Sequence, residues 1–485
     1  MTSAVRVIHV CDLSETELVS FGIARGETLL EGEWFVRPDT QRSQAARMPR
    51  ETAVVGAFTQ IHVVQPSLCT VVATTSVRFT DVAAIVESTN SDGRVIVTAI
   101  RPDRLRSVEE HRRLLHRLAV SIDVAATVAG AGIAGVGIVG YGPFGGMGYT
   151  HGLAATETDG LRLVGVCDSN AERRDAARAD FPHTNLHVDI ESLCGDDEVD
   201  VAIVATPPVL HAPVALALLR AGKHVVVEKP MCLTAADADL LLAEASAVQR
   251  TITVHQSRRW DGDYLALRRA IDAGTIGEVF NMETFVGSFE HPCRWWHSDE
   301  ALSGGAVYDW GSHHIDWILQ IFGGPPDSVR ASSHKRVWRD VSNSDQIDVQ
   351  MRWADGREAR FIQSDVAAIR KPKFFVQGTA GTIAAHYRQV VLDELIAGRG
   401  HTPASWHHAE VPSTLRLARY EPGYSIVEMT LPPVATPRWP FHRALADHLL
   451  LGEPSPVPAE QSRDVVAVLE RAHRSAACGD AVQSA

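Results

Sequence analysis

A short apolar strand that leads into a glycine-rich turn constrains the fold of this 485-residue chain more than any other feature. Residues Val136–Val139 are largely apolar, and glycines follow in the spacing G-x-G-x-x-G. Between a strand and a helix, such a turn lets the backbone approach a pyrophosphate at the helix N-terminus. We therefore predict a dinucleotide site at Gly140, Gly142, Pro143, Phe144 and Gly145.

The same glycine spacing also occurs just before this strand, at Gly130, Gly132 and Gly135. That copy runs into a strand and not into a helix, whereas a phosphate-binding turn requires the strand first and the helix second. We interpret residues 129–135 as a linker.

Downstream of the turn, short apolar segments alternate with helical stretches. The expected strands are Leu163–Cys167, Val201–Ala205, His224–Val227 and Thr251–Val254. The expected helices are Ala171–Ala179, Val209–Ala221 and Ala235–Ala247. The alternation predicts a parallel sheet covered by helices on both faces, and we expect this dinucleotide-binding domain to span residues 134–256.

An acidic residue stands at the end of the second expected strand. Asp168 follows Gly145 by 23 residues (168 − 145). A carboxylate at this place accepts hydrogen bonds from the adenosine ribose hydroxyls and repels a 2′-phosphate, so Asp168 favours NAD over NADP. Arg173 and Arg174 lie close enough in sequence to leave NADP open.

The flanking regions have different patterns. Residues 1–133 combine expected strands with expected helices, whose starts fit capping boxes at Ser14-x-x-Glu17 and Ser107-x-x-Glu110, so we expect an α/β accessory domain of unknown role there. Residues 257–485 contain longer alternating strands, which predict an α/β domain with a large open, mostly antiparallel sheet. We expect loops between about 389 and 437, then two helices near 441–451 and 461–475.

Charge and cysteine usage exclude several classes of protein. The net charge of −13 offers no basic surface to nucleic acid or anionic lipid. Seven cysteines without a C-x-x-C spacing indicate free thiols in a reducing cytoplasm. The uncharged stretch 124–149 is too rich in glycine for a membrane helix, and residues 1–15 lack a secretion signal. We expect a cytoplasmic protein.

Three residues have the chemistry needed to oxidise an alcohol with NAD. Lys229 ends an expected strand and supplies positive charge for a developing alkoxide. His313 can accept the hydroxyl proton because imidazole titrates near neutrality. On a continuous helix, Asp309 and Asp316 would share the face of His313, and His314 would point elsewhere and be structural.

Other side chains are candidates for substrate or metal binding. Arg258 and Trp296 could line a sugar site, with core packing as the alternative for the tryptophan. The pairs His313/His314 and His407/His408 lack any H-E-x-x-H or C-x-x-C context, so we expect no metal.

Taken in order, these motifs resemble the glucose–fructose oxidoreductase / inositol dehydrogenase / MocA (Gfo/Idh/MocA) family. The resemblance spans about residues 134–480 and leaves the N-terminal region unmatched. Besides the glycine turn and Asp168, it rests on residues 205–211, on Ala221–Val225 leading into Glu228-Lys229-Pro230, and on Gly304-Gly305 followed by Asp309, Gly311, His313 and Asp316. Pro208 and Ser303 depart from the family pattern, which puts contacts in the cleft in doubt.

The resemblance implies a Rossmann domain followed by an α/β domain on a large open sheet, with the active site between them. It implies that Lys229, Asp309 and His313 act on a sugar or cyclitol hydroxyl. It also implies cofactor contacts from Thr206, Pro207, His211, Glu228 and Lys229, and a homo-oligomer, dimer or tetramer, assembled through the C-terminal sheet.

The resulting hypothesis is an NAD(P)-dependent dehydrogenase of a sugar, amino sugar, sugar derivative or cyclitol. One alternative enzyme retains and recycles NAD, giving net epimerisation, elimination or glycoside cleavage. A non-catalytic dinucleotide sensor is the alternative from another class, although a sensor needs no base such as His313.

Overall fold

The computed structural model separates into two compact units, Met1–Gly132 and Ile133–Ala485. In the first unit it describes the backbone of residues 6–9, 23–38, 52–63, 69–77, 80–90, 93–98 and 100–102. In the second it describes residues 133–142, 146–293, 296–387, 412–434, 436, 438–479 and 482–483.

The described part of the first unit is a seven-stranded sheet in the order β1-β6-β5-β4-β2-β3-β7. Its strands are β1 (Arg6–His9), β2 (Ile23–Pro38), β3 (Thr52–Val63), β4 (Cys69–Val77), β5 (Thr80–Asn90), β6 (Gly93–Thr98) and β7 (Ile100–Pro102). The pair β1–β6 is parallel, and the other pairs are antiparallel. The long strands β2 and β5 were not expected, since the strands predicted from the sequence were Val5–Val10, Gln60–Val64, Val71–Phe79 and Val95–Ile100. The helices expected near residues 14 and 107 lie outside the described residues, so the α/β class of this region stays a prediction.

The second unit begins with the expected parallel sheet, in the order β10-β9-β8-β11-β12-β13. Its strands are β8 (Ala134–Val139), β9 (Leu161–Cys167), β10 (Asn185–His187), β11 (Val201–Val204), β12 (His224–Val227) and β13 (Ile252–Val254). The connecting helices are α3 (Met147–Glu157), α4 (Ala171–Asp180), α5 (Ile190–Cys194), η3 (Pro208–Leu210), α6 (His211–Arg220) and α7 (Ala235–Ala247). This is a Rossmann sheet, whose strand order reverses between β8 and β11 and places the ligand crevice at their carboxyl ends.

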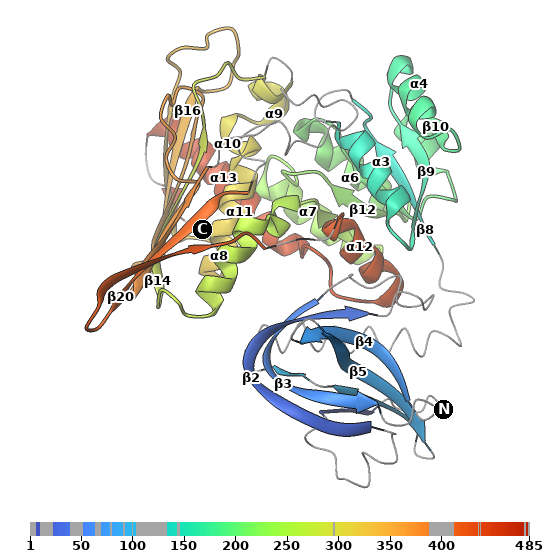
Figure 1. The fold of residues 1–485 in the computed structure, drawn as a ribbon. Coiled ribbons are helices and arrows are strands. Elements are labelled where there is room, and N and C mark those ends of the chain that lie inside the picture. Colours follow the sequence, from blue (N-terminus) through green and yellow to red (C-terminus); the bar gives the residue numbers. More distant parts are fainter. Residues whose placement is uncertain are drawn as a thin grey trace. The chain divides into compact units, whose positions relative to one another are not determined.

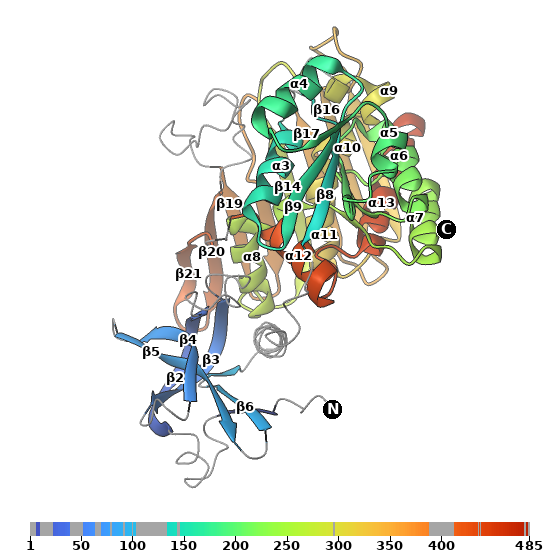
Figure 2. The ribbon, with the colours of Figure 1, turned by 90° about the vertical axis from the view of Figure 1, so that its right-hand side faces the viewer.

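The strands β8, β9, β11 and β12 contribute buried residues to both faces of this sheet, because one apolar core lies on each side. Helices α5, α6 and α7 pack on one face, and α3, α4 and α12 (Pro440–Leu451) pack on the other. Figure 2 shows α3 and α6 on opposite sides of β8. The helix α12 thus returns from the end of the chain to cover the Rossmann sheet. Packing therefore crosses the expected boundary at residue 256, and the predicted division of this unit into two domains stays a prediction.

The rest of the unit is built on a nine-stranded sheet in the order β21-β20-β19-β18-β14-β17-β16-β15-β22. Its strands are β14 (Val279–Gly287), β15 (Ser328–His334), β16 (Gln346–Arg352), β17 (Glu358–Ser364), β18 (Phe374–Gly378), β19 (Gly381–His386), β20 (Thr414–Glu421), β21 (Ser425–Leu431) and β22 (Val482–Gln483). Only the pair β14–β17 is parallel, so the sheet is mostly antiparallel, as expected.

Helices cover one face of this sheet (Figure 1). They are α8 (Gly262–Asp272), α11 (Gly311–Phe322) and α13 (Ala459–Cys478), joined by the short elements η4 (Ser257–Trp260), η5 (Trp296–Ser298), α9 (Glu300–Ser303) and α10 (Ala306–Asp309). The helix α13 contacts both α7 and β15, which ties the two sheets of this unit together. Within the described residues, no helix has the length and apolar character that a membrane span needs.

The stretch from about residue 389 to 437 was expected to contain loops, and its described part also contains the hairpin β20–β21, which was not expected. Most side chains of β21 are at least partly exposed, so the strand lacks the alternation of buried residues by which a sequence reveals a strand.

Candidate active site

The expected dinucleotide site coincides with a cleft of about 370 Å³ at the carboxyl ends of the Rossmann strands. Its lining comes from the loops that follow β8, β9, β10, β11 and β12, from the helices after these loops, and from η5. The lining includes Gly140, Gly142, Asp168, Arg173, Thr206, Pro207, Glu228, Lys229, Trp296 and His297. Sequence reasoning had named all of these as candidates except His297, although Arg173 had been considered only for cofactor choice.

The backbone of the glycine turn leaves no room for a side chain at its start. Gly140 has a φ of 95°, and a Cβ atom there would lie 2.7 Å from the carbonyl oxygen of Ala205. Helix α3 approaches the strand equally closely, since a Cβ on Gly148 would lie 2.7 Å from the carbonyl oxygen of Gly140. Gly148 was missed by sequence reasoning. The turn residues Pro143, Phe144 and Gly145 lie outside the described residues.

Asp168 is buried at the end of β9, where its carboxylate is already held in place. It accepts hydrogen bonds from the backbone N–H groups of Tyr141 and Asn170, both at 2.9 Å. The guanidinium of Arg173 lies 3.7 Å from the same carboxylate. Asp168, which favours free ribose hydroxyls, and Arg173, which could bind a 2′-phosphate, are therefore neighbours in the cleft.

The loop after β11 contains Thr206 and Pro207, which line the cleft. The buried Oγ1 of Thr206 has no hydrogen-bond partner within the described part of the chain, which fits a site that a dinucleotide completes. His211, an expected cofactor contact, is buried between two cleft loops. Its ring nitrogens lie 2.7 Å from the carbonyl oxygen of Pro230 and 2.8 Å from that of Thr206, and a neutral ring donates to one of the two.

At the far end of the cleft, Lys229 meets Asp309. The Nζ atom of Lys229 donates to Oδ1 of Asp309 at 2.7 Å, and it lies 3.3 Å from the carbonyl oxygen of the same residue. Both side chains keep part of their surface exposed. The structure thus brings two of the three expected catalytic residues into direct contact, and neither side chain is fully buried.

His313 lies on α11, close enough to Lys229 for the ammonium charge to affect its pKa. The ring is buried, and its Nδ1 has no hydrogen-bond partner among the described residues. Burial lowers the pKa of His313 well below its ordinary value, and the charges of Lys229 and Arg258 lower it further. The ring is therefore neutral at pH 7 and in the form that accepts a proton.

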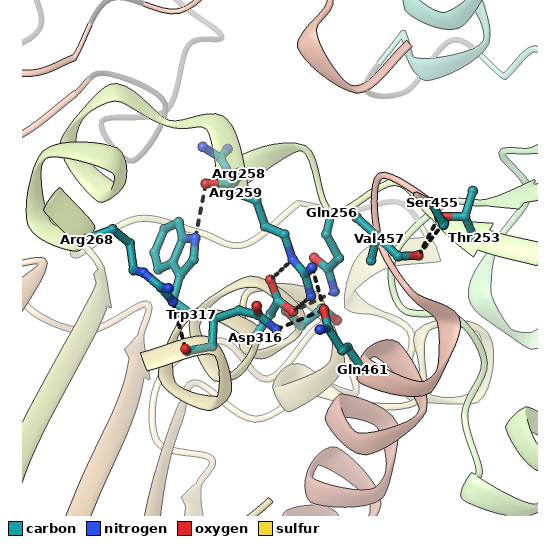
Figure 3. Close-up of polar contacts among 12 residues, drawn as sticks. Thr253, Gln256, Arg258, Arg259, Arg268, Asp316, Trp317, Ser455, Val457 and Gln461 are labelled. Carbon is teal, nitrogen blue, oxygen red and sulfur yellow. Dashed lines mark hydrogen bonds and ion pairs between the residues drawn. The ribbon is translucent and has the colours of Figure 1, made fainter. Parts of the chain in front are cut away.

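The expected continuous helix from Asp309 to Asp316 is wrong. Helix α10 ends at Asp309 and α11 begins at Gly311, so the carboxylate of Asp309 is turned to Lys229. Asp316 forms a buried ion pair with Arg259 at 2.5 and 2.8 Å, which Figure 3 shows. A periodic spacing could not reveal a one-residue break in the helix.

The candidate sugar-binding residues lie around this centre. The guanidinium of Arg258 stacks 4.8 Å from the ring centroid of Trp310, and the indole N–H of Trp317 donates to the carbonyl of Arg258 at 3.0 Å (Figure 3). Trp296 stacks on His297 with ring centroids 3.6 Å apart, and both line the cleft. Burial lowers the pKa of His297 to about 4, so this ring is also neutral.

A further carboxyl group, missed by sequence reasoning, belongs to the same neighbourhood. Asp365 follows β17, and burial raises its pKa to about 7, with the charges of Asp309 and Asp345 adding to the effect. Beside it, a cavity of about 570 Å³ opens at the ends of β14, β17 and β19. The smaller cleft is the better candidate for the reaction centre, because it contains Lys229.

Comparisons with known proteins agree with this architecture. Residues 134–256 match the oxidoreductase family with an NAD-binding Rossmann fold, and residues 264–384 match the GFO/IDH/MocA C-terminal domain. Together the two matches account for most of the described second unit.

Individual relatives and a solved structure give the same result. The scyllo-inositol 2-dehydrogenase (NADP(+)) IolW of Bacillus subtilis is 28% identical over 329 residues, covering 67% of this chain and 89% of that protein. The inositol 2-dehydrogenase of Rhizobium meliloti is 28% identical over 54% of this chain and 79% of its own length. The crystal structure of an NAD-binding protein from Listeria innocua is 28% identical, has a TM-score of 0.61 and covers 73% of this chain and 97% of that one. With its Rossmann cleft, its open sheet and both domain matches, the chain belongs to the Gfo/Idh/MocA family of NAD(P)-dependent oxidoreductases.

Proposed function

We propose that this protein oxidises a secondary hydroxyl of a sugar, amino sugar, sugar derivative or cyclitol to a ketone, or catalyses the reverse reaction. The contact that supports this proposal best is the 2.7 Å ion pair of Lys229 and Asp309 at the end of the dinucleotide cleft. The neutral, buried ring of His313 is close enough to Lys229 for the ammonium charge to lower its pKa. The inositol dehydrogenases among the relatives support a polyol substrate.

Different residues of the chain would bind the dinucleotide, stabilise the alkoxide and accept the proton. The glycine turn at Gly140 and the loop of Thr206 would hold the dinucleotide, and Asp168 would bind its ribose. When bound, NAD(P)⁺ supplies the hydride acceptor. Lys229 would stabilise the developing alkoxide, Asp309 would fix the ammonium group in position, and His313 would accept the hydroxyl proton. Arg258 and Trp296 would orient the substrate.

The experiment is to follow the absorbance of the reduced nicotinamide while a panel of polyols is added. The panel includes scyllo-inositol, which the name of the B. subtilis relative specifies, together with hexoses and amino sugars. Reduction with at least one polyol supports the proposal. If the protein binds the dinucleotide but reduces it with no polyol of the panel, the non-catalytic sensor is favoured. If NAD stays bound through purification, the enzyme that recycles its cofactor is favoured.

A further inference from the structure

Directly behind Lys229, a chain of buried imidazoles ends on the carboxylate of Glu228. Nε2 of His442 lies 2.9 Å from Nδ1 of His151, and Nε2 of His151 lies 2.9 Å from Oε1 of Glu228. Nδ1 of His255 lies 2.8 Å from the same oxygen. All four side chains are buried. They come from α3, α12 and the loops after β12 and β13, and the proposed reaction uses none of the three imidazoles.

The acceptor capacity of Glu228 determines where the protons lie. An ionised carboxylate only accepts, so His151 donates through Nε2 and His255 through Nδ1. His151 then accepts at Nδ1 from the Nε2–H group of His442. The second oxygen of Glu228 accepts from the backbone N–H of Lys229 at 3.1 Å. The contacts of His151 and His442 are thereby satisfied with both of these rings neutral.

The electrostatics agree with this arrangement. Burial favours a protonated Glu228, but the charge of His255 and the hydrogen bonds from His151 and His255 outweigh it, and the pKa of Glu228 lies well below its usual value. Burial lowers the pKa of His151, and it lowers that of His442 well below the ordinary value. The carboxylate therefore keeps its negative charge.

Other groups near Glu228 leave this charge in place. The ammonium of Lys229 is paired with Asp309 at 2.7 Å. His211 and His313 are close enough to respond to Glu228, but burial lowers the pKa of each, so both rings are neutral. Glu228 also lines the cleft at the same end as Lys229.

We propose that Glu228 is a fixed negative charge that makes the cleft bind oxidised nicotinamide more tightly than reduced nicotinamide, and that His151 and His255 are the positioning residues that hold it there. The inference rests on the proposed function, because it requires the nicotinamide ring to lie at the Lys229 end. The oxidised ring is positive and the reduced ring is neutral, so a nearby carboxylate separates their affinities by about tenfold.

The test compares the dissociation constants of NAD⁺ and NADH for the full-length protein. If NADP⁺ and NADPH bind more tightly, the test uses that pair. In Glu228→Gln, which keeps the side chain's shape, the oxidised form should bind about tenfold more weakly and the reduced form nearly as before. The control is Asp196→Asn, because Asp196 also accepts from a buried imidazole, that of His187 at 3.0 Å, but lies outside the cleft lining. Equal changes for both forms in Glu228→Gln would overturn the inference and leave the proposed function intact.

A pair of variants at His255 tests the positioning role. An asparagine amide places an N–H group near the position of Nδ1, whereas leucine removes the donor. His255→Asn should keep the wild-type ratio of the two affinities, and His255→Leu should move it toward that of Glu228→Gln. If His255→Asn and His255→Leu had the same ratio of the affinities for oxidised and reduced nicotinamide, His255 would not be a positioning residue for Glu228.

Two further outcomes would contradict the inference. The three imidazoles offer ligand atoms within 4.8 Å of one another, so stoichiometric zinc in the purified protein would replace the hydrogen-bonded chain by a metal site. A wild-type protein that binds neither dinucleotide would overturn the proposed function and this inference together.

Discussion

The ammonium of Lys229 and the carboxylate of Asp309 meet at 2.7 Å, although 80 positions separate them in the chain. Lys229 follows β12 of the Rossmann sheet, and Asp309 ends α10 beside the large sheet. The contact therefore exists only when the two parts of the second unit are packed together. It places a fixed positive charge where the proposed alkoxide would form.

Loss of this ion pair should reduce turnover more than binding. We expect Lys229→Met and Asp309→Asn each to lower kcat by roughly 10²–10³-fold, the effect of removing one preorganised electrostatic partner. The dissociation constant of the dinucleotide should change little. Steady-state kinetics with fluorescence titration would check this. The surface ion pair Arg463–Asp239, at 2.8 Å, provides the control Arg463→Ala. An unchanged kcat in Lys229→Met would exclude a catalytic role for Lys229.

Cofactor choice should depend on the neighbours Asp168 and Arg173. We expect NAD to be used with a higher kcat/KM than NADP, by about tenfold, the effect of one hydrogen bond to a charged group. Arg173→Ala should weaken NADP further, and the exposed Arg178→Ala on the same helix should change neither cofactor. A wild-type preference for NADP, which the name of the B. subtilis relative includes, would mean that Arg173 outweighs Asp168.

Stability should fall in mild acid. The pKa values of His313, His314 and His442 are lowered by burial, so below about pH 6.5 the unfolded chain binds protons that the folded chain does not. Their contribution to the free energy of unfolding is complete above pH 6.5 and is lost as the pH falls. Urea unfolding between pH 5 and pH 7.5 would measure this slope.

A variant pair isolates the effect of one ring. His314→Phe should flatten the pH dependence, since it removes one ionisable group from the core, whereas substitution of the exposed His183 by alanine should not. An equal slope in the wild type and in His314→Phe would contradict the explanation.

The N-terminal unit should be dispensable for the chemistry. We propose that it is an accessory domain with a role in assembly or partner binding, because the second unit is compact by itself and contains the whole candidate site. A shortened protein that begins at Ala131 should bind dinucleotide and keep the activity of the full chain. If it folds and binds NAD but has lost that activity, the N-terminal unit must belong to the active site.

Much of the architecture was predictable because it follows local patterns. The apolar runs of β8, β11 and β12 and the turn at Gly140 are contiguous in sequence, and each signals its structure without reference to distant residues. Asp168 and Lys229, which follow β9 and β12, could be placed in one cleft because parallel strands end at the same edge of a sheet.

The remaining features depend on contacts between distant segments. Nothing in the sequence near Glu228 reveals that His151 and His255 donate to it, since both partners are positioned by other elements. The helix break at Trp310 redirects Asp309, and the hairpin β20–β21 lies on a mostly exposed edge. Such features arise from tertiary packing, which periodicity does not report.

The most direct test of the catalytic assignment is a single-turnover measurement of hydride transfer with a polyol that the wild-type protein oxidises. His313→Asn should slow this step by roughly 10²–10⁴-fold at pH 7, the range for loss of a general base. His314→Asn, at the neighbouring buried histidine, should retain a rate close to that of the wild type. A His313→Asn protein that transfers hydride at the wild-type rate would contradict the central claim that this ring accepts the proton.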